Sequence, residues 1–425
     1  MNKKRAVVTI SALNYSSRVE ALAETFAKFH PGITFYSYVI DDPGTNSAEA
    51  LKKTSGKPRA SRAPKRINRT LADLNRFAAK QIPALSLQSM IFQYDVVEAC
   101  TSIKPLVLLQ LLLEDEYEEV LYLDPDIMIC GSLNSVWKEF SKADVLLTPH
   151  LITFGNFTDS IVSERMILLS GTFNLGFIGV ASSDNTIEFL AWWAQRLVRY
   201  SFRAVHQGLF TDQKWIDLAL SAVEKVAILR DPGLNVAIWN IHERKVSRDS
   251  DQKYRVGKSL LKFFHFSGFD PNTPDVLNKF RSKIMLSSLG ATKPLAKEYA
   301  RLLKKHSHDK CSAIPYALNN FSNGIAIPEF LRPWTRSSPT FFDYRLPYDV
   351  NAENSFFSWL TAGAPGEIPG LIKVFRTYRE DLQKAFPESE PDSDIRLKQW
   401  FDVQGYSEYP FDPRLVEIIR SSTAP

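Results

Sequence analysis

Residues 120–129 read VLYLDPDIMI, an apolar run interrupted only by Pro125 and the carboxylates of Asp124 and Asp126. The apolar residues predict a buried strand, and strand alternation would place side chains i and i+2 on the same side of the backbone. Two carboxylates so close together repel each other unless a cation lies between them. Mg²⁺ or Mn²⁺ held by one or two carboxylates usually takes its remaining ligands from substrate phosphates. The segment therefore predicts a divalent metal site that handles phosphate.

Other meanings of this motif are weighed against the metal site. An Asp-x-Asp pair alone more often marks a strand end or a solvated turn, and the apolar residues on both sides are what favour a metal here. A phosphatase of the haloacid-dehalogenase type also has an apolar strand leading into Asp-x-Asp. That chemistry requires Thr or Val two residues past the second Asp, where this chain has Met128. The phosphatase is disfavoured but stays open.

The composition indicates a large globular protein. The chain has 425 residues, enough for two domains, and 44% of them are hydrophobic. No run approaches the roughly 18 apolar residues of a membrane span, and the first residues, MNKKR, lead directly into a strand-like segment, which predicts no signal peptide. Three widely spaced cysteines, Cys100, Cys130 and Cys311, fit a reducing cytosol better than a disulfide framework. We therefore expect a cytoplasmic protein.

The net charge of +5 comes from one local patch. Residues 52–69 contain eight Lys or Arg and no acid, and without them 44 basic residues face 47 acidic ones. The Gly, Pro and Ser content predicts a mobile insertion at about 45–70. It could be a solvated loop, or it could contact a phosphate-rich or anionic membrane surface. We expect no nucleic-acid partner, because no aromatic residue is interleaved with the basic ones.

Apolar runs and helical periodicities alternate along the first part of the chain. Strands are predicted at residues 6–10, 33–40, 120–123, 143–147, 171–180, 225–229 and 260–266, and helices at 18–29, 105–113 and 185–200. Alternating strands and helices predict an α/β sheet that binds ligands beyond the carboxyl ends of its strands.

The pattern changes beyond about residue 276. Helix-like segments at 279–289 and 295–305 are followed by a proline-punctuated loop at 327–347. We therefore expect an α/β domain at 1–275 and a mainly helical region at 276–425.

Several residues outside the aspartate pair are candidates for the same site. The first glycine is Gly32, so neither G-x-G-x-x-G nor a P-loop follows the first strand. His265, near the end of an apolar strand, is by itself more often a core residue, but its imidazole could complete the site and favour Mn²⁺ over Ca²⁺. Asp212 precedes a predicted helix and could be its N-cap. Lys104, before the helix at 105–113, could be an ordinary surface lysine.

In their order along the chain, these motifs resemble the retaining nucleotide-sugar glycosyltransferases of family eight, the group that contains glycogenin and bacterial galactosyltransferases. The resemblance covers roughly residues 5–272 and rests on Asn14-Tyr15, Thr101-x-x-Lys104-Pro105, Tyr122-Leu-Asp124-Pro-Asp126, Phe173-Asn174-Leu-Gly176, Asp212-Gln213 and His265-Phe-x-Gly268. The chain is most similar to a bacterial surface-polysaccharide subgroup with a helical extension, which residues 315–321 and 323–328 also resemble. The resemblance implies a single Rossmann-like, GT-A-type domain with a mainly helical C-terminal region.

The resemblance also implies roles for individual residues. It makes Asp124, Asp126 and His265 the ligands of Mn²⁺ or Mg²⁺. It makes Gln213 and Asp212 the pair beside the anomeric carbon, with Asn174 contacting the sugar or the acceptor. It implies that the donor is bound by Thr9, Asn14, Tyr15, Lys104, Asp124 and Gly268, with Lys104 on the diphosphate.

Two positions depart from the family pattern. The family usually has an acidic residue two positions before its Asn-Tyr, where it reads the uracil ring, and this chain has Ala12. It also tends to have a lysine that holds phosphate three residues past the glycine of the histidine motif, where this chain has Pro271. The first departure weakens the expectation of uridine, and the second leaves Lys104, the metal or the basic insertion to neutralise the diphosphate.

The implied enzyme is a metal-dependent hexosyltransferase. It would move a hexose-type sugar from a nucleotide diphosphate, with a UDP-sugar as the first expectation, to a saccharide or lipid-linked saccharide with retention of configuration, in bacterial cell-surface polysaccharide synthesis. A metal-dependent sugar-phosphate phosphatase and a non-catalytic saccharide-binding subunit are the alternatives. The intact Asp-Pro-Asp motif and His265 argue against the binding subunit, which has no need of a phosphate-bridging metal.

Overall fold

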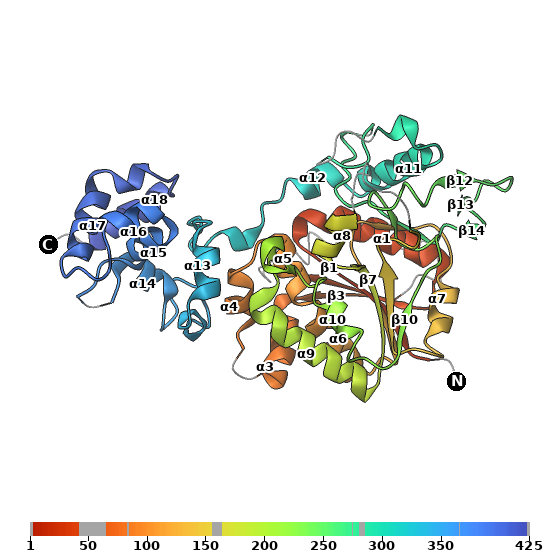
Figure 1. The fold of residues 1–425 in the computed structure, drawn as a ribbon, viewed down its shortest axis with the longest axis horizontal. Coiled ribbons are helices and arrows are strands. Elements are labelled where there is room, and N and C mark those ends of the chain that lie inside the picture. The colour runs from red at the N-terminus through yellow and green to blue at the C-terminus, as the bar shows by residue number, and fades with distance from the viewer. Residues whose placement is uncertain are drawn as a thin grey trace. The chain divides into compact units, whose positions relative to one another are not determined.

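The protein forms two compact units, residues Met1–Leu74 with Val96–Tyr316 and residues Asn75–Asp95 with Ala317–Pro425. Figure 1 shows the computed structural model of the chain. It describes residues 3–41, 65–82, 85–154, 164–273, 275–279, 285–364 and 366–422. We refer to the two parts as the first unit and the second unit.

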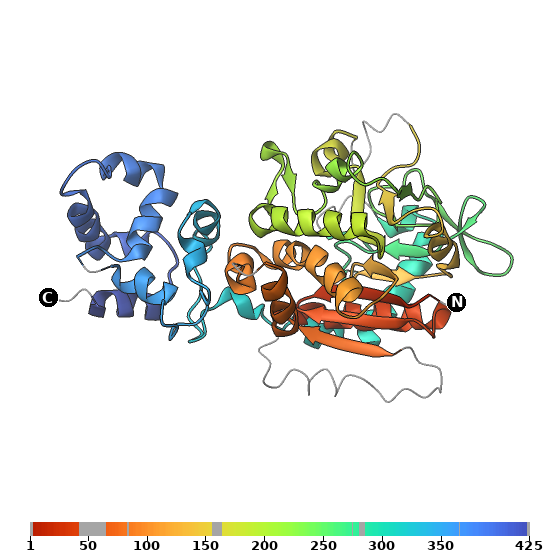
Figure 2. The ribbon, with the colours of Figure 1, turned by 90° about the horizontal axis from the view of Figure 1, so that it is seen from below.

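A seven-stranded mixed sheet forms the centre of the first unit (Figure 2). Its order is β10 (Val226–Ile228), β6 (Val145–Pro149), β7 (Phe173–Ala181), β4 (Glu119–Leu123), β1 (Arg5–Ser11), β2 (Thr34–Val39) and β3 (Arg66–Thr70). Strand β7 is antiparallel to both of its neighbours, and the other pairs are parallel. This confirms the predicted α/β class.

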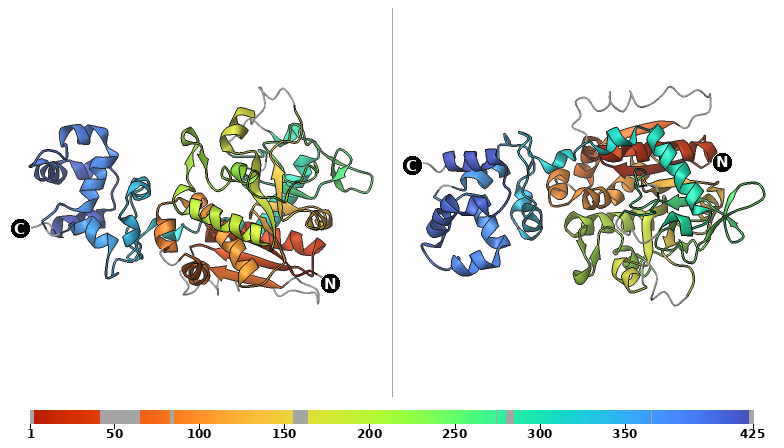
Figure 3. Two further views of the ribbon diagram at one scale, coloured as in Figure 1. Left: turned by 60° about the horizontal axis from the view of Figure 1, so that its bottom comes forward. Right: turned by 90° about the horizontal axis from the view of Figure 1, so that it is seen from above.

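Helices cover the sheet. Helix α1 (Ser16–Phe29) and helix α7 (Asn134–Glu139) bury Leu22, Phe26 and Trp137 in one apolar cluster with residues of β1, β4 and β7. Helix α6 (Lys104–Leu113) packs against α9 (Asp184–Tyr200) and against β4 (Figure 3). The short helix α8 (Glu164–Ser170) lies between β6 and β7 in the sequence, and the short helix α10 (Ile216–Ala219) precedes β10.

Smaller sheets complete the first unit. One has the order β11 (Val236–Ala237), β15 (Phe263–His265) and β5 (Ile127–Ile129), with β15 antiparallel to β5. The others are an antiparallel group of β12 (Val246–Arg248), β13 (Tyr254–Val256) and β14 (Ser259–Leu260), and the pair β8 (Arg203–Ala204) and β9 (Leu209–Phe210).

The apolar run at 120–129 is not one strand. Its first half is β4 of the large sheet and its second half is β5 of a small sheet, with a turn at Asp124–Asp126 between them. The prediction that strand alternation aligns the two carboxylates is therefore wrong, because proline and the change of sheet interrupt the extended backbone. The turn itself brings the carboxylates together.

Most predicted elements are confirmed, with two corrections. Residues 66–70, predicted as part of a mobile insertion, form edge strand β3. In this strand the Arg66 side chain donates a hydrogen bond to Glu20, and the Arg69 side chain donates one to Asp115. Residues 42–64, which hold most of the basic patch, lie outside the described part of the chain. Within the predicted helix at 279–289, the described residues include only a 3₁₀ turn at Leu286–Ser288.

One helical segment corrects the expectation about apolar runs. Among the described residues, Val96–Leu113 is long and apolar enough to span a membrane by length and composition, with a mean hydropathy of 1.7. It comprises α5 (Val96–Ser102) and α6, and 72% of it is buried inside the structure. One such segment is weak evidence for a span, because core helices have the same composition.

Cys100, Cys130 and Cys311 are all free thiols.

The compact units divide at 316/317, whereas the sequence predicted a boundary at 275/276. Helix α11 (Thr292–Lys305) buries Leu295, Tyr299 and Leu303 in one cluster with Phe264 and Phe266 of the first unit. The rings of Tyr299 and Phe266 stack at a centroid distance of 4.2 Å and an angle of 9°. The described residues from 276 to 316, which include α11 and α12 (His308–Ser312), therefore belong to the first unit.

The second unit is helical and packs around aromatic rings. Its helices are α4 (Leu87–Phe92), α13 (Leu331–Ser337), α14 (Phe356–Ala362), α15 (Gly370–Tyr378), α16 (Glu380–Ala385), α17 (Ser393–Val403) and α18 (Pro413–Ser422); α3 (Leu71–Gln81) leads into it. Phe92 lies 5.0 to 5.3 Å from the rings of Phe341, Tyr348 and Phe356. Arg332 donates hydrogen bonds to the carbonyls of Phe92 and Tyr94. These contacts place residues 75–95 with the C-terminal helices.

Tyr299→Ala should loosen the first unit alone. Removing a fully buried ring should destabilise that unit by about 3 kcal/mol or more, because Phe266 loses its stacking partner. Hydrogen exchange resolved by mass spectrometry should show faster exchange in β15 and unchanged exchange in α15. Leu218→Ala, at a 57% exposed position, is the control. Equal loss of protection in both units would contradict the assignment of α11.

Candidate functional site

The turn between β4 and β5 is held by backbone hydrogen bonds on both sides. The Asp124 amide donates to the carbonyl of Gly176 at 2.8 Å, and the Phe266 amide donates to the carbonyl of Asp126 at 2.9 Å. His265 is paired with Ile127 in the register of β15 and β5. The two aspartates are therefore anchored to β7 on one side and to the end of β15 on the other.

This anchoring brings Asp124, Asp126 and His265 into one cluster. The Nε2 atom of His265 lies 2.9 Å from Oδ1 of Asp126 and 3.7 Å from Oδ2 of Asp124. One ligand-type atom from each residue lies within 4.8 Å of the other two. The imidazole is buried and the carboxylates are partly exposed, so the cluster is open to a ligand on the carboxylate side.

The two carboxylates have different electrostatic surroundings. Burial raises the pKa of Asp124, and Asp126 adds to the rise, although Lys104 and His265 oppose it. Burial also acts on Asp126, but His265 outweighs it and the pKa of Asp126 is lowered. Burial alone would lower the pKa of His265, and Asp126 reverses that effect, so the pKa of His265 is raised. The pKa shifts of Asp126 and His265 therefore run in opposite directions, because each group favours the charged form of the other.

Gly176 is needed for the imidazole to fit. A Cβ atom at this position would touch Cε1 of His265, lie 2.6 Å from its Nδ1, and lie 2.8 Å from Oδ1 of Asn174. A glycine inside a strand often marks the close approach of a ligand or another backbone. The structure shows that a histidine side chain approaches instead.

The cluster fits a divalent metal. Two carboxylates and a neutral imidazole are the donor set expected for Mn²⁺, and Mg²⁺ also accepts carboxylate oxygens. The site also meets the usual requirement that the second nitrogen of a ligating histidine is hydrogen-bonded. Asp124 has its own such partner, because the hydroxyl of Tyr122 donates to its Oδ1 at 2.7 Å.

Asn235 is the partner of His265, and no sequence motif predicted it. Its Oδ1 lies 3.3 Å from Nδ1 of His265. An amide oxygen only accepts, so Nδ1 carries the hydrogen and Nε2 faces the carboxylates. The amide nitrogen of Asn235 donates to Thr148 at 2.9 Å and to Oδ1 of Asn174 at 3.0 Å. Asn235 has a left-handed backbone (φ 50°), a conformation that asparagine tolerates.

Asn174 extends the network to Gln213. Its Nδ2 donates to Oε1 of Gln213 at 3.3 Å, and the amide of Leu175 donates to the same oxygen at 3.1 Å. The Nε2 atom of Gln213 donates to the carbonyl of Ser170 at 2.8 Å. Buried amides thus connect the cluster of Asp124, Asp126 and His265 to Gln213, the predicted catalytic glutamine.

Lys104 and Asp212 form a buried ion pair. Nζ of Lys104 lies 2.6 Å from Oδ2 of Asp212, donates to the carbonyl of Leu175 at 2.8 Å, and lies 4.2 Å from the ring centre of Tyr122. Both side chains are at most 2% exposed. Lys104 is therefore not a surface lysine, and its hydrogens face protein groups. Asp212 is not a helix N-cap either, because α10 begins at Ile216.

Three of the predicted donor residues, Thr9, Asn14 and Tyr15, lie in the carboxyl-terminal half of β1 and in the turn after it. Oγ1 of Thr9 and Oδ1 of Asn14 are buried with no hydrogen-bond partner among the described residues. Tyr15 ends a 3₁₀ turn at Leu13–Tyr15 and is 36% exposed. Gly268 follows His265 in a left-handed turn (φ 69°). The orphaned oxygens indicate a place where a ligand could bond.

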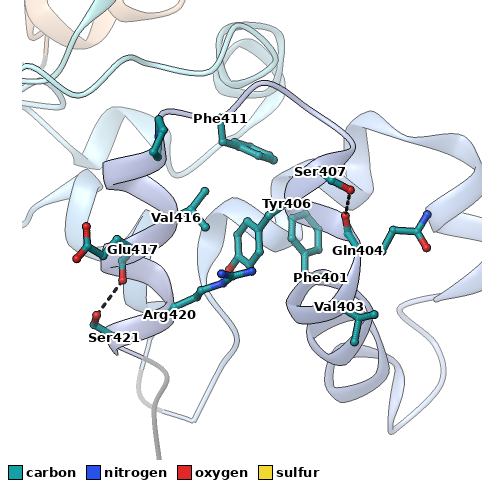
Figure 4. Close-up of a pocket in the computed structure, with 11 residues that line it drawn as sticks. Phe401, Val403, Gln404, Tyr406, Ser407, Phe411, Val416, Glu417, Arg420 and Ser421 are labelled. Carbon is teal, nitrogen blue, oxygen red and sulfur yellow. Dashed lines mark hydrogen bonds between the residues drawn. The ribbon is translucent and has the colours of Figure 1, made fainter.

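The second unit has a separate hollow of about 830 Å³ (Figure 4). Its polar groups mostly bond within the unit: Ser407 donates to the carbonyl of Gln404, Ser421 donates to that of Glu417, and Arg420 lies over the ring of Tyr406. Within the described residues, the group able to hold a metal ion is the one in the first unit. The candidate site is therefore assigned to the first unit.

Comparison with known proteins gives distant relatives. No protein-family model matches the chain. YfnF of Bacillus subtilis (strain 168), an uncharacterized protein, is 28% identical over 176 residues, which are 41% of this chain and 58% of YfnF. YfnD of the same organism, also uncharacterized, is 24% identical over 237 residues, or 55% of this chain and 73% of YfnD. The chain thus spans little more than half of YfnF.

Similar solved structures are glycosyltransferases, at low overall similarity. The galactosyltransferase LgtC, solved with donor and acceptor sugar analogs, is 16% identical with a TM-score of 0.38 over 73% of this chain and 97% of LgtC. The glycosyltransferase GlyE of Streptococcus pneumoniae TIGR4 is 14% identical with a TM-score of 0.40, over 75% and 67%. Mouse xyloside xylosyltransferase 1 is 14% identical with a TM-score of 0.36, over 61% and 97%.

Gly176→Ala should displace His265 and weaken metal binding. The new methyl group overlaps the imidazole, so we expect a loss of about 1–3 kcal/mol in stability and weaker binding of Mn²⁺, measured by electron paramagnetic resonance titration. Gly32→Ala is the matched control, because a Cβ there meets nothing within 4 Å. Unchanged Mn²⁺ affinity in Gly176→Ala would contradict the packing described here.

Two substitutions of Asn235 should separate the effect of its acceptor atom, Oδ1, from the effect of its donor atom, Nδ2. Asn235→Gly keeps the left-handed backbone but removes every side-chain bond, so Mn²⁺ affinity should fall about 10- to 100-fold. Asn235→Asp keeps an acceptor for Nδ1 of His265 and should retain most of the Mn²⁺ affinity. The same titration measures both. If the glycine variant binds Mn²⁺ as tightly as the unmodified protein, Asn235 does not hold the imidazole.

Proposed function

We propose that the protein is a metal-dependent glycosyltransferase. It moves a hexose-type sugar from a nucleoside diphosphate donor to a saccharide or lipid-linked saccharide acceptor, with retention of configuration. The donor is a UDP-sugar in the first instance. The expected setting is the synthesis of bacterial cell-surface polysaccharide in the cytoplasm.

One observation carries the proposal. The cluster of Asp124, Asp126 and His265 is joined through Asn235 and Asn174 to Gln213 by consecutive buried hydrogen bonds. A phosphate-binding cluster alone would suit many reactions. Its fixed connection to a second polar group supports a reaction in which phosphate leaves a carbon held beside it.

The roles of the residues follow from their positions. Asp124, Asp126 and His265 would hold Mn²⁺ or Mg²⁺, which when bound supplies positive charge to the oxygens of a diphosphate. Gln213 would steady the positive charge that develops at the anomeric carbon through its Oε1 atom, which two hydrogen bonds at 3.1 and 3.3 Å hold in place. Asn174 fixes that amide and would contact the sugar or the acceptor. These groups are ordered before reaction, which favours electrostatic stabilisation.

A front-face transfer accounts for retention. The bond between the anomeric carbon and the phosphate oxygen breaks, the acceptor oxygen bonds to the same face of that carbon, and the acceptor proton passes to the departing phosphate. No protein base is then required. A covalent intermediate on Asp212 is disfavoured, because its Oδ2 is ion-paired with Lys104 at 2.6 Å and its Oδ1 accepts from Thr211 at 3.1 Å.

A membrane contact through residues 52–69 is a weaker part of the proposal. Arg66 and Arg69, the last two of its eight basic residues, bond Glu20 and Asp115 within the protein. The remaining six would supply the attraction to an anionic surface.

Asp126→Ala should abolish donor turnover. Hydrolysis of UDP-, dTDP-, GDP- and ADP-sugars with Mn²⁺ should fall more than about 100-fold, since even partners outside the ligand set are worth about 10- to 100-fold. The release of nucleoside diphosphate is the measurement. Asp251→Ala, at an exposed aspartate, should keep the activity of the unmodified protein.

Two results would overturn the proposal. Equal turnover by Asp126→Ala and by the unmodified protein would exclude a role for the cluster. Release of inorganic phosphate from sugar phosphates, without turnover of any nucleotide sugar, would favour the phosphatase instead.

A further inference from the structure

Arg18 is a buried cation without a carboxylate partner. Its side chain is 8% exposed, and among the described residues it forms no ion pair. Nη2 donates to the carbonyl of Phe269 at 2.9 Å, and the guanidinium lies 4.4 Å from the ring centre of Tyr15. Charged groups removed from water are normally paired. A buried guanidinium in these surroundings is suited to bind an anionic ligand.

Arg18 lies beside the residues already assigned to the donor. Tyr15 belongs to the turn after β1, and Phe269 directly follows Gly268 of the histidine motif. The guanidinium therefore bridges two segments that approach the cluster from opposite ends of the sequence. Its charge also reaches Asp126: burial raises the pKa of that carboxyl, and His265 and then Arg18 lower it.

Neither of the two positions that the family pattern assigns to the phosphates offers an uncommitted cation. Lys104 is ion-paired with Asp212 and bonded to the carbonyl of Leu175. Pro271 stands where a phosphate-binding lysine would follow the histidine motif. A positive side chain that contacts the diphosphate beside the metal would therefore come from another position.

We propose that Arg18 binds the diphosphate of the donor and takes the place of the lysine that Pro271 removes. This rests on the proposed function. A guanidinium has five N–H donors in a planar fork, and the contact with Phe269 accounts for one of them. Two parallel bonds to phosphate oxygens are the geometry in which arginine binds anions most strongly. The Tyr15 ring holds the fork in position for this contact.

The test compares a nucleoside diphosphate with its monophosphate. UDP and UMP, and likewise the dTDP, GDP and ADP pairs, are titrated by calorimetry with Mg²⁺ against the full chain. For the base that the unmodified protein prefers, Arg18→Met should weaken binding of the diphosphate by about tenfold or more, while the monophosphate changes less. The ratio of diphosphate affinity to monophosphate affinity should therefore fall. General loosening of the site would instead lower both affinities by a similar factor and leave the ratio unchanged. Arg18→Lys should retain part of the preference, because it keeps the charge but not the fork.

The matched control is Arg248→Met. Arg248 also lies 4.4 Å from a tyrosine ring centre, that of Tyr254, but is ion-paired with Glu298 away from the cluster; its loss should leave both affinities unchanged. An unchanged ratio of diphosphate to monophosphate affinity in both Arg18 variants overturns the role of Arg18 alone. If the unmodified protein binds no nucleoside diphosphate, the proposed function fails together with it.

Discussion

The turn at Asp124-Pro-Asp126 is the constraint on which the rest of the site depends. It ends β4 of the large sheet and starts β5 of the small one, so the chain changes sheets within three residues. The backbone of the turn bonds Gly176 on one side and Phe266 on the other. Any movement of β15 or β7 would therefore move a carboxylate, and the geometry of the cluster is a property of the whole first unit.

Close packing and buried polar bonds keep this site in one arrangement. Gly176 leaves the space that His265 occupies, and Asn235 orients the imidazole from behind. A buried polar network is favourable only when its members are satisfied, and here the bonds of Asn235, Asn174 and Gln213 satisfy one another. The Lys104–Asp212 pair closes the same region with an ion pair that is almost completely buried. Polar groups held in a fixed arrangement are what the proposed electrostatic stabilisation requires.

The protein builds its two units from segments that are discontinuous in sequence. Phe92 and its neighbours lie more than two hundred residues before the helices they join, and Arg332 bonds their carbonyls directly. Helix α11 contributes Tyr299 to the core of the α/β unit instead. The change from alternating strands and helices to helices alone near residue 276 does not coincide with the boundary between the two units. The unit to which a helix belongs depends on the surface against which it packs.

The sequence by itself determined the α/β class, the order of most elements, and the grouping of Asp124, Asp126 and His265. Strand and helix periodicity is a local property of the sequence. The ability of carboxylates and imidazoles to bind metal ions can also be recognised from residue type alone. The tertiary structure alone decided that the aspartates lie in a turn, that Lys104 and Asp212 are paired, and that Asn235 stands behind His265. It also decided where the units divide and left Arg18 buried without a counterion. These features depend on strand register and on packing between distant segments, which a linear pattern of residues does not encode.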